Sequence, residues 1–129
     1  LFDREKTMKF YISSDFGDSS LFKTKTFTQE IDIKTKRFDE FCEEQEIKNI
    51  KLFKLEAEGG EPEVLMGCGM KLEIIEYISA DLGFERGLNQ ESTLPKVVNF
   101  LLGKGFELKS INSPRLVCLF RNKNLKIKA

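Results

Sequence analysis

Three acidic residues stand where the ends of two predicted strands could bring them together. Glu56 and Glu58 lie two residues apart at the end of a strand predicted at 50–57, and Asp81 lies near the end of another at 77–82. Side chains two apart on a strand share one face, with Cα atoms roughly 6 to 7 Å apart. Clustered carboxylates raise one another's pKa, so one of them could act as a general base near neutral pH.

Two other interpretations of these carboxylates stay open. They could hold a hard cation such as Mg²⁺, because that ion prefers oxygen ligands. In a purely structural arrangement, Glu58 and Glu61 instead cap the helix that follows, and only Glu56 faces a ligand. Structural ion networks of that kind also occur away from functional sites.

The composition removes several other kinds of site. The 129 residues contain no His, which excludes Ser-His and Cys-His nucleophile pairs and the commonest metal ligand. Gly67-Cys68-Gly69 lacks the third glycine of a dinucleotide-binding turn, and no GxxxxGK[ST] occurs. The counts of 21 basic and 21 acidic residues argue against a nucleic-acid partner. The apolar runs are too short to cross a membrane.

The three cysteines form neither a metal-binding pattern nor a disulfide framework. Cys42, Cys68 and Cys118 are widely spaced. We interpret them as reduced thiols that pack as small hydrophobic side chains, which places the protein in the cytoplasm.

The elements that carry these residues follow from hydrophobic periodicity and turn residues. Helices are predicted after a cap at Thr35, from Pro62, and after a cap at Ser92 or Thr93, with a loop at 83–87. Strands are predicted at 8–13, 24–34, 50–57, 77–82, 106–111 and 116–120.

This order predicts an α/β fold with a mainly parallel sheet, a C-terminal antiparallel hairpin and helices on both faces. The strand at 50–57 is the candidate for the centre of the sheet, because it is apolar on both faces. We expect a single domain over 1–129, with its core at 8–122 and a basic tail at 123–129.

One run of residues is more specific than any of these patterns. It reads Lys54-Leu55-Glu56-Ala57-Glu58-Gly59-Gly60-Glu61 and continues through Val64-Leu65-Met66-Gly67-Cys68. It resembles the K-[IL]-[DE]-x-E-G-x-E motif and V-L-x-G-[AC] helix of the FkbM-type methyltransferases. The weaker features that agree are Gly17-Asp18-Ser19-Ser20-Leu21, Asp81-Leu82-Gly83-Phe84-Glu85-Arg86-Gly87 and Gly105-Phe106-Glu107-Leu108.

The resemblance implies a Rossmann-like sheet and an S-adenosylmethionine-dependent O-methyltransferase that acts on a small-molecule or sugar hydroxyl. It places Glu56 and Gly59 beside the methyl donor, with Glu58 in the family's E-G pair. Methyl transfer needs alignment and a base for the hydroxyl, and without His a carboxylate is the natural base. Glu56, Glu58 and Asp81 are therefore the candidate catalytic residues.

The sequence departs from the family in one respect. The V-D-x-G-A-N-x-G turn and the acidic residue that holds the ribose have no counterpart before Ile50. The chain therefore resembles the carboxyl-terminal half of the family, and we expect it to bind S-adenosylmethionine weakly or not at all on its own. The start at Leu1 rather than Met is a further hint of a longer natural protein.

Two other hypotheses compete with a methyltransferase. The chain could be a non-catalytic binding or assembly module that forms a homodimer through an open sheet edge. It could also be a different carboxylate-based enzyme, assisted by a metal ion.

Overall fold

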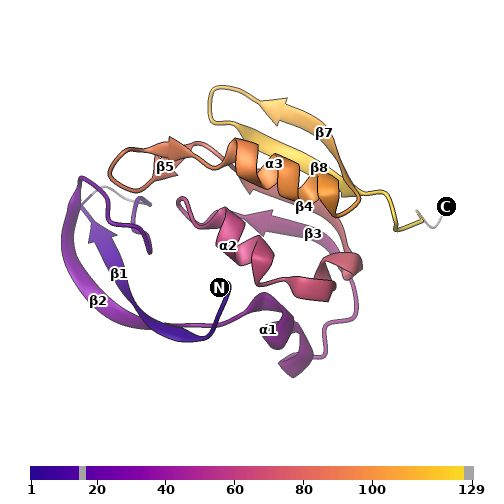
Figure 1. Ribbon diagram of the computed structural model, residues 1–129, viewed down its shortest axis with the longest axis horizontal. Helices are drawn as coiled ribbons and strands as arrows, with labels where there is room; N and C mark the ends of the chain where they lie inside the picture. Colours follow the sequence, from indigo (N-terminus) through magenta and orange to yellow (C-terminus); the bar gives the residue numbers. More distant parts are fainter. Residues whose placement is uncertain (15–16, 127–129) are drawn as a thin grey trace.

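A computed structural model describes residues 1–14 and 17–126 of the chain and shows an α/β fold built on a four-stranded sheet (Figure 1). The strands follow the order β3 (Ile50–Leu55), β4 (Ile75–Asp81), β8 (Val117–Asn122) and β7 (Phe106–Asn112). Among the described residues of this sheet, only β3 and β4 pair in parallel. The α/β class is confirmed, but the prediction of a mainly parallel sheet is wrong.

The position of β8 explains this difference. The C-terminal hairpin of β7 and β8 forms as expected, and β8 inserts between β4 and β7. Strand β8 is antiparallel to both neighbours, so β4 and β7 run in the same direction without pairing with each other. One inserted strand thus makes two of the three pairings antiparallel.

The helices lie on one face of this sheet (Figure 1). They are α1 (Phe38–Glu44), α2 (Glu61–Met66), the 3₁₀ helix η1 (Gly69–Ile74) and α3 (Leu94–Gly103). All four share one hydrophobic core with the covered sheet face, which includes Phe38, Cys42, Leu55, Val64, Leu65, Leu72, Ile78, Ala80, Val97, Leu101, Phe106, Cys118 and Phe120.

The prediction of helices on both faces is therefore wrong for the described residues. The crossovers from β3 to β4 and from β4 to β7 advance along the sheet in the same direction. Right-handed crossovers that advance in one direction place their helices on the same face.

The opposite face and the β3 edge have no cover among the described residues. Leu52 lies on that face, opposite Tyr77 in the register, and its exposed fraction is 55%. Strand β3 pairs only with β4 in the part that the structure describes. It is thus an edge strand, whereas the sequence predicted a central one.

A separate antiparallel ribbon precedes the sheet and lies to its left in Figure 1. It joins β1 (Lys6–Ser13) to β2 (Phe27–Thr35), with Phe10 opposite Ile31. Thr35 does not cap α1 as predicted, because Arg37 occupies the cap position and the Thr35 hydroxyl hydrogen-bonds to the backbone of Arg4 and Lys6.

The loop predicted at 83–87 is a small hairpin instead. Strand β5 (Phe84–Arg86) pairs with β6 (Glu91–Ser92). Helix α3 then starts after Thr93, and the backbone N–H of Leu94 donates to the Ser92 hydroxyl at 3.2 Å. The sequence located the start of α3 but missed the hairpin, since β5 has only three residues.

The cysteines pack as predicted. Cys42, Cys68 and Cys118 are free thiols buried in the core, and burial raises the pKa of Cys68 to about 12. The basic tail predicted at 123–129 lies partly outside the described residues. In the described part, no helix is long and apolar enough to span a membrane.

Candidate functional site

The family-like motif forms a tight turn between β3 and α2. Strand β3 ends at Leu55, and the backbone N–H of Gly60 donates to the Ala57 carbonyl at 2.9 Å. Glu58 has a φ of 46° and Gly59 a φ of 94°, both in the left-handed region. Glu58 therefore follows the strand in a turn, and the prediction that it shares one strand face with Glu56 is wrong.

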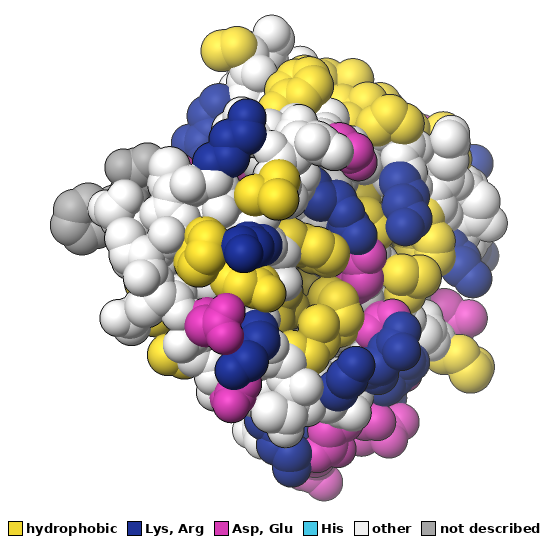
Figure 2. Space-filling model, turned by 60° about the vertical axis from the view of Figure 1, so that its left-hand side comes forward, with side chains coloured by type: hydrophobic (Ala, Val, Ile, Leu, Met, Phe, Trp, Pro, Cys, Tyr) yellow, Lys and Arg dark blue, Asp and Glu magenta, His cyan; other side chains and the backbone are white. Residues whose placement is uncertain are grey.

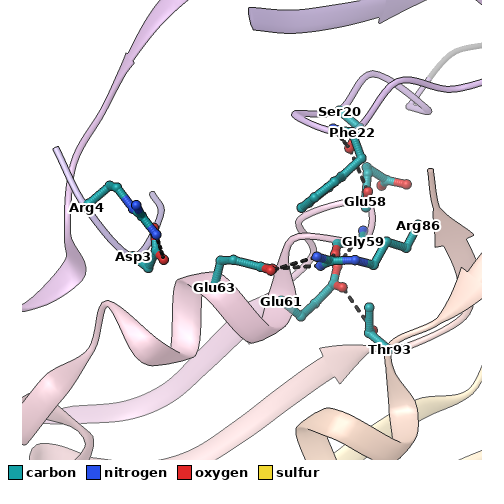
Figure 3. A network of polar contacts seen from close by, with 10 residues as sticks. All are labelled: Asp3, Arg4, Ser20, Phe22, Glu58, Gly59, Glu61, Glu63, Arg86 and Thr93. Atoms are coloured by element: carbon teal, nitrogen blue, oxygen red, sulfur yellow. Dashed lines mark hydrogen bonds and ion pairs between the residues drawn. The ribbon is translucent and has the colours of Figure 1, made fainter. Parts of the chain in front are cut away.

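Glu61 holds this turn closed from inside. Its exposed fraction is 1%. One carboxylate oxygen accepts the backbone N–H groups of Ala57 at 2.9 Å and Gly59 at 3.2 Å. The other accepts the Thr93 hydroxyl at 3.0 Å (Figure 3). Charge-assisted hydrogen bonds of this kind are the stronger class. The structural alternative, in which Glu58 and Glu61 cap the helix that follows, is wrong, because no side chain caps α2 and Glu61 closes the turn before it.

Arg86 links the β5 hairpin to the same turn. Its guanidinium makes a two-pronged ion pair with Glu63, both bonds at 2.7 Å, and donates to the Gly59 carbonyl at 2.6 Å (Figure 3). It also stacks over the Phe22 ring, with Cζ 3.9 Å from the ring centre. A Cβ on Gly59 would lie 2.6 Å from the Cα of Arg86, so only glycine fits at this position.

Ser20 fixes the turn from a third side. Its hydroxyl donates to the Glu58 carbonyl at 2.7 Å and accepts the backbone N–H of Phe22 at 3.0 Å. Ser20 is buried and pairs with Tyr11 of β1 through backbone hydrogen bonds. The turn is thus held by residues from three separate parts of the chain.

The side chain of Glu58 meets a second carboxylate at a small cavity. The cavity has a volume of about 160 Å³ and is lined by Asp18, Thr24, Lys25, Thr26, Glu58, Phe84, Glu85, Gly87 and Gln90. Burial, together with the nearby charge of Glu85, raises the pKa of Glu58 to about 8. Burial and the charge of Asp81 raise the pKa of Glu85 as well. The two side chains are hydrogen-bonded to each other.

Asp81 is buried at the end of β4, with an exposed fraction of 4%. Its carboxylate accepts the backbone N–H of Gly83 at 3.3 Å and a guanidinium N–H of Arg115 at 2.8 Å. It does not line the cavity of Glu58, and it acts on that cavity through the charge it places near Glu85.

Glu56 faces a different space. It is exposed, and Lys54 Nζ lies 3.0 Å from its carboxylate. It lines a cavity of about 350 Å³ between the β1–β2 ribbon and the end of β3, together with Phe10, Leu21, Ile33, Leu55 and Val64. Figure 2, which brings the ribbon side forward, shows hydrophobic side chains around a hollow flanked by charged ones. Glu58 lines this cavity as well as the 160 Å³ cavity, so Glu56 and Glu58 meet at the larger of the two.

Sequence reasoning missed Glu85 and Arg86 as parts of this arrangement. Both belong to the run Asp81 to Gly87 that agreed with the family, so the signal was present. The sequence did not reveal the role of Arg86, because its partners Glu63 and Gly59 lie 23 and 27 residues away along the chain.

The described residues do not form a complete site for S-adenosylmethionine. Glu56 and the apolar lining beside it could hold part of such a molecule. However, Glu61 already takes the Gly59 amide, and among the described residues no further strand or turn pairs with the free edge of β3. Among the described residues, no group of three or more Cys, Asp and Glu side chains is arranged to hold a metal ion.

Comparisons with known proteins agree with the motif. The sequence profile of the Methyltransferase FkbM domain matches residues 3–108. This range contains the ribbon, the motif turn and the β5 hairpin, and ends within β7. Neither a curated protein nor a solved structure gives a significant match. The chain belongs to the FkbM methyltransferase domain family.

Proposed function

We propose that this chain is the carboxyl-terminal part of a Rossmann-like, S-adenosylmethionine-dependent O-methyltransferase. It supplies the acidic turn and the acceptor side of the site. The observation that carries this proposal is the turn of Glu58 and Gly59, which Glu61, Arg86 and Ser20 fix beside the cavity. Such a fixed turn suits a reaction that depends on alignment.

The proposed chemistry needs a base for the acceptor hydroxyl, and the acids supply it. The pKa of Glu58, raised to about 8, lies near neutral pH, where proton exchange with a substrate is most effective. Glu56 would face the donor side from the neighbouring cavity, beside Gly59. Asp81 would set the local charge from its buried position.

The uncovered sheet supports the placement in a larger catalytic domain. The bare face at Leu52 and the unpaired edge of β3 are the surfaces that further strands and helices of a doubly wound sheet would cover. We therefore also propose that the donor's main binding turn lies outside this chain. The acceptor would be a small-molecule or sugar hydroxyl, and the buried free thiols support a cytoplasmic location.

A methyl-transfer assay tests the function. The polypeptide from the complete reading frame is incubated with methyl-tritiated S-adenosylmethionine and pooled sugars, phenols and alcohols, and labelled products are separated. We expect label in methyl ethers, and a loss of at least about 100-fold when Glu58 and Glu85 are both replaced by Gln. Label on nitrogen, or transfer that this double variant leaves intact, would contradict the proposal.

One observation favours a second candidate, an assembly module. Strand β3 offers an unpaired edge, and such edges pair with other chains. Lys51 and Lys54 stand on this strand with side chains 74% and 68% exposed, and each is paired with an acid, Glu76 at 2.6 Å and Glu56 at 3.0 Å. Light scattering over a concentration series separates the candidates, because a stable dimer supports the module and a monomer counts against it.

A further inference from the structure

We infer that Glu85 and Glu58 act as one proton-sharing carboxyl pair, in which the ionised Glu85 receives the proton of a hydroxyl bound in the 160 Å³ cavity. This inference rests on the proposed function and assigns the base within it. Glu85 was not among the acids predicted from the sequence.

The geometry brings the two carboxyls together from different elements. Glu58 comes from the turn after β3, and Glu85 from the middle of β5. Arg86, next to Glu85, donates to the carbonyl of Gly59, next to Glu58, at 2.6 Å. This side-chain hydrogen bond joins the two segments that carry the acids, and both acids line one cavity.

The same cavity has an unused hydrogen-bonding group. The hydroxyl oxygen of Thr24 is buried and has no hydrogen-bond partner among the described residues. Buried polar atoms are normally paired, and Thr24 lines this cavity, so its hydroxyl is an unmet hydrogen-bonding group in the cavity wall. Phe84 and Gln90 complete a lining that offers one apolar and several polar contacts.

The surrounding charges determine which carboxyl keeps the proton. Asp18 and Glu61 add negative charge near Glu58, and Asp81 and Glu61 do so near Glu85, while Arg115 partly offsets this at Glu85. Lys25 is the cation on the cavity wall. Two carboxyls this close do not both ionise readily. The shared hydrogen bond favours the protonated form of Glu58 and the ionised form of Glu85.

The proton step is then balanced. At neutral pH the pair holds one proton, on Glu58. When the acceptor reacts, its O–H bond breaks, the electron pair stays on the acceptor oxygen, and the proton forms a new O–H bond on Glu85. The pair briefly holds two protons and releases one to solvent.

A carbon-13 titration tests the pair on the chain as it is. Glutamate labelled at the side-chain carboxyl is followed by NMR from pH 3 to pH 10. In a coupled pair, the signals of Glu58 and Glu85 each show the same two midpoints, one of them near pH 8. If Glu58 and Glu85 of the wild-type chain each titrate in one independent step with a different midpoint, the inference is overturned.

Substitution sharpens the same measurement. Glu85→Gln removes the neighbouring charge, so the midpoint of Glu58 should fall by more than one pH unit. The matched control Glu91→Gln removes an exposed charge from the partner strand β6, and the midpoint of Glu58 should stay in place. An unchanged Glu58 midpoint in a folded Glu85→Gln variant would mean that burial alone acts, and would overturn the pair.

The methyl-transfer assay gives the second arm. We expect Glu85→Gln to lower kcat by about 100-fold or more, with the KM for the methyl donor unchanged. Absence of any transfer in the wild type would refute the proposed function but leave the titration result standing. Full activity of Glu85→Gln would refute the assignment of Glu85 as base.

Discussion

The acidic residues around the motif turn fall into two groups that do opposite work. Glu61 and Glu63 are buried and have every carboxylate oxygen occupied, by backbone N–H groups, Thr93 or Arg86. Glu58 and Glu85 face a cavity, and burial raises the pKa of both, helped by the charge of Glu85 at Glu58 and by the charge of Asp81 at Glu85. The first group stabilises the turn. The second group has raised pKa values, which suit carboxyls that exchange protons with a substrate. Burial alone therefore does not distinguish a structural carboxylate from a reactive one, whereas the partners do.

The largest expected effect comes from removing a structural carboxylate. Glu61→Ala leaves the N–H groups of Ala57 and Gly59 and the hydroxyl of Thr93 unpaired inside the protein. We expect a loss of about 3 kcal/mol or more in the free energy of unfolding, measured by urea titration. The milder Glu61→Gln should lose less, since it keeps one acceptor oxygen. A loss below about 1 kcal/mol in Glu61→Ala would erase the distinction between the two groups.

A somewhat smaller loss in the free energy of unfolding is expected when Arg86, the partner of Glu63, is replaced. Arg86→Met leaves Glu63 without its guanidinium partner and frees the Gly59 carbonyl, which should cost about 2–3 kcal/mol. The control is Lys36→Met, which breaks the exposed pair with Glu44 at 2.6 Å and should cost less than about 1 kcal/mol. Equal losses in both variants would show that Arg86 has no special role in the turn.

The smallest effect has the opposite sign. The folded-state pKa of Glu58 is raised from 4.5 to about 8, so the folded protein holds a proton that the unfolded chain releases. Stability from this group is therefore full below about pH 4.5 and is lost as the pH rises through about 8. Glu58→Gln removes this loss, and at pH 9 it should stabilise the protein by on the order of 1 kcal/mol after screening is allowed for.

Thermal unfolding at pH 5, 7 and 9 measures this effect. The stability gain of Glu58→Gln over the wild type should grow from pH 5 to pH 9, while Glu91→Gln should keep the wild-type pH dependence. A Glu58→Gln variant that loses stability at pH 9 would place Glu58 among the structural carboxylates.

Local patterns allowed much of the fold to be predicted. The run from Leu94 to Leu102 predicted α3, and Pro62 marked the first turn of α2. What failed depended on contacts between distant residues. The residues of β8 (Val117–Asn122) do not by themselves indicate that this strand lies between β4 and β7. The apolar residues on both faces of β3 predicted that helices cover both faces, but Leu52 is exposed.

The sequence identified several residues of the site, but it did not show how they come together in space. The motif located Glu58 and Gly59 correctly at the end of a strand, but strand alternation was extended into a turn with positive φ. Glu85 lies 27 residues from Glu58 in the sequence, so their pairing depends on how the β5 hairpin folds back onto the turn. Sequence separation hides such a pair even when both residues belong to recognised motifs.

Calorimetric titration of the chain with S-adenosylmethionine tests the central claim most directly. The claim is that residues 1–129 hold the acidic acceptor side of a methyltransferase site but lack the main binding turn for the donor. We predict no saturable heat, or a Kd above about 1 mM, which corresponds to a binding free energy weaker than about −4 kcal/mol. A micromolar Kd for the wild-type chain would contradict the claim and show that the donor site is complete.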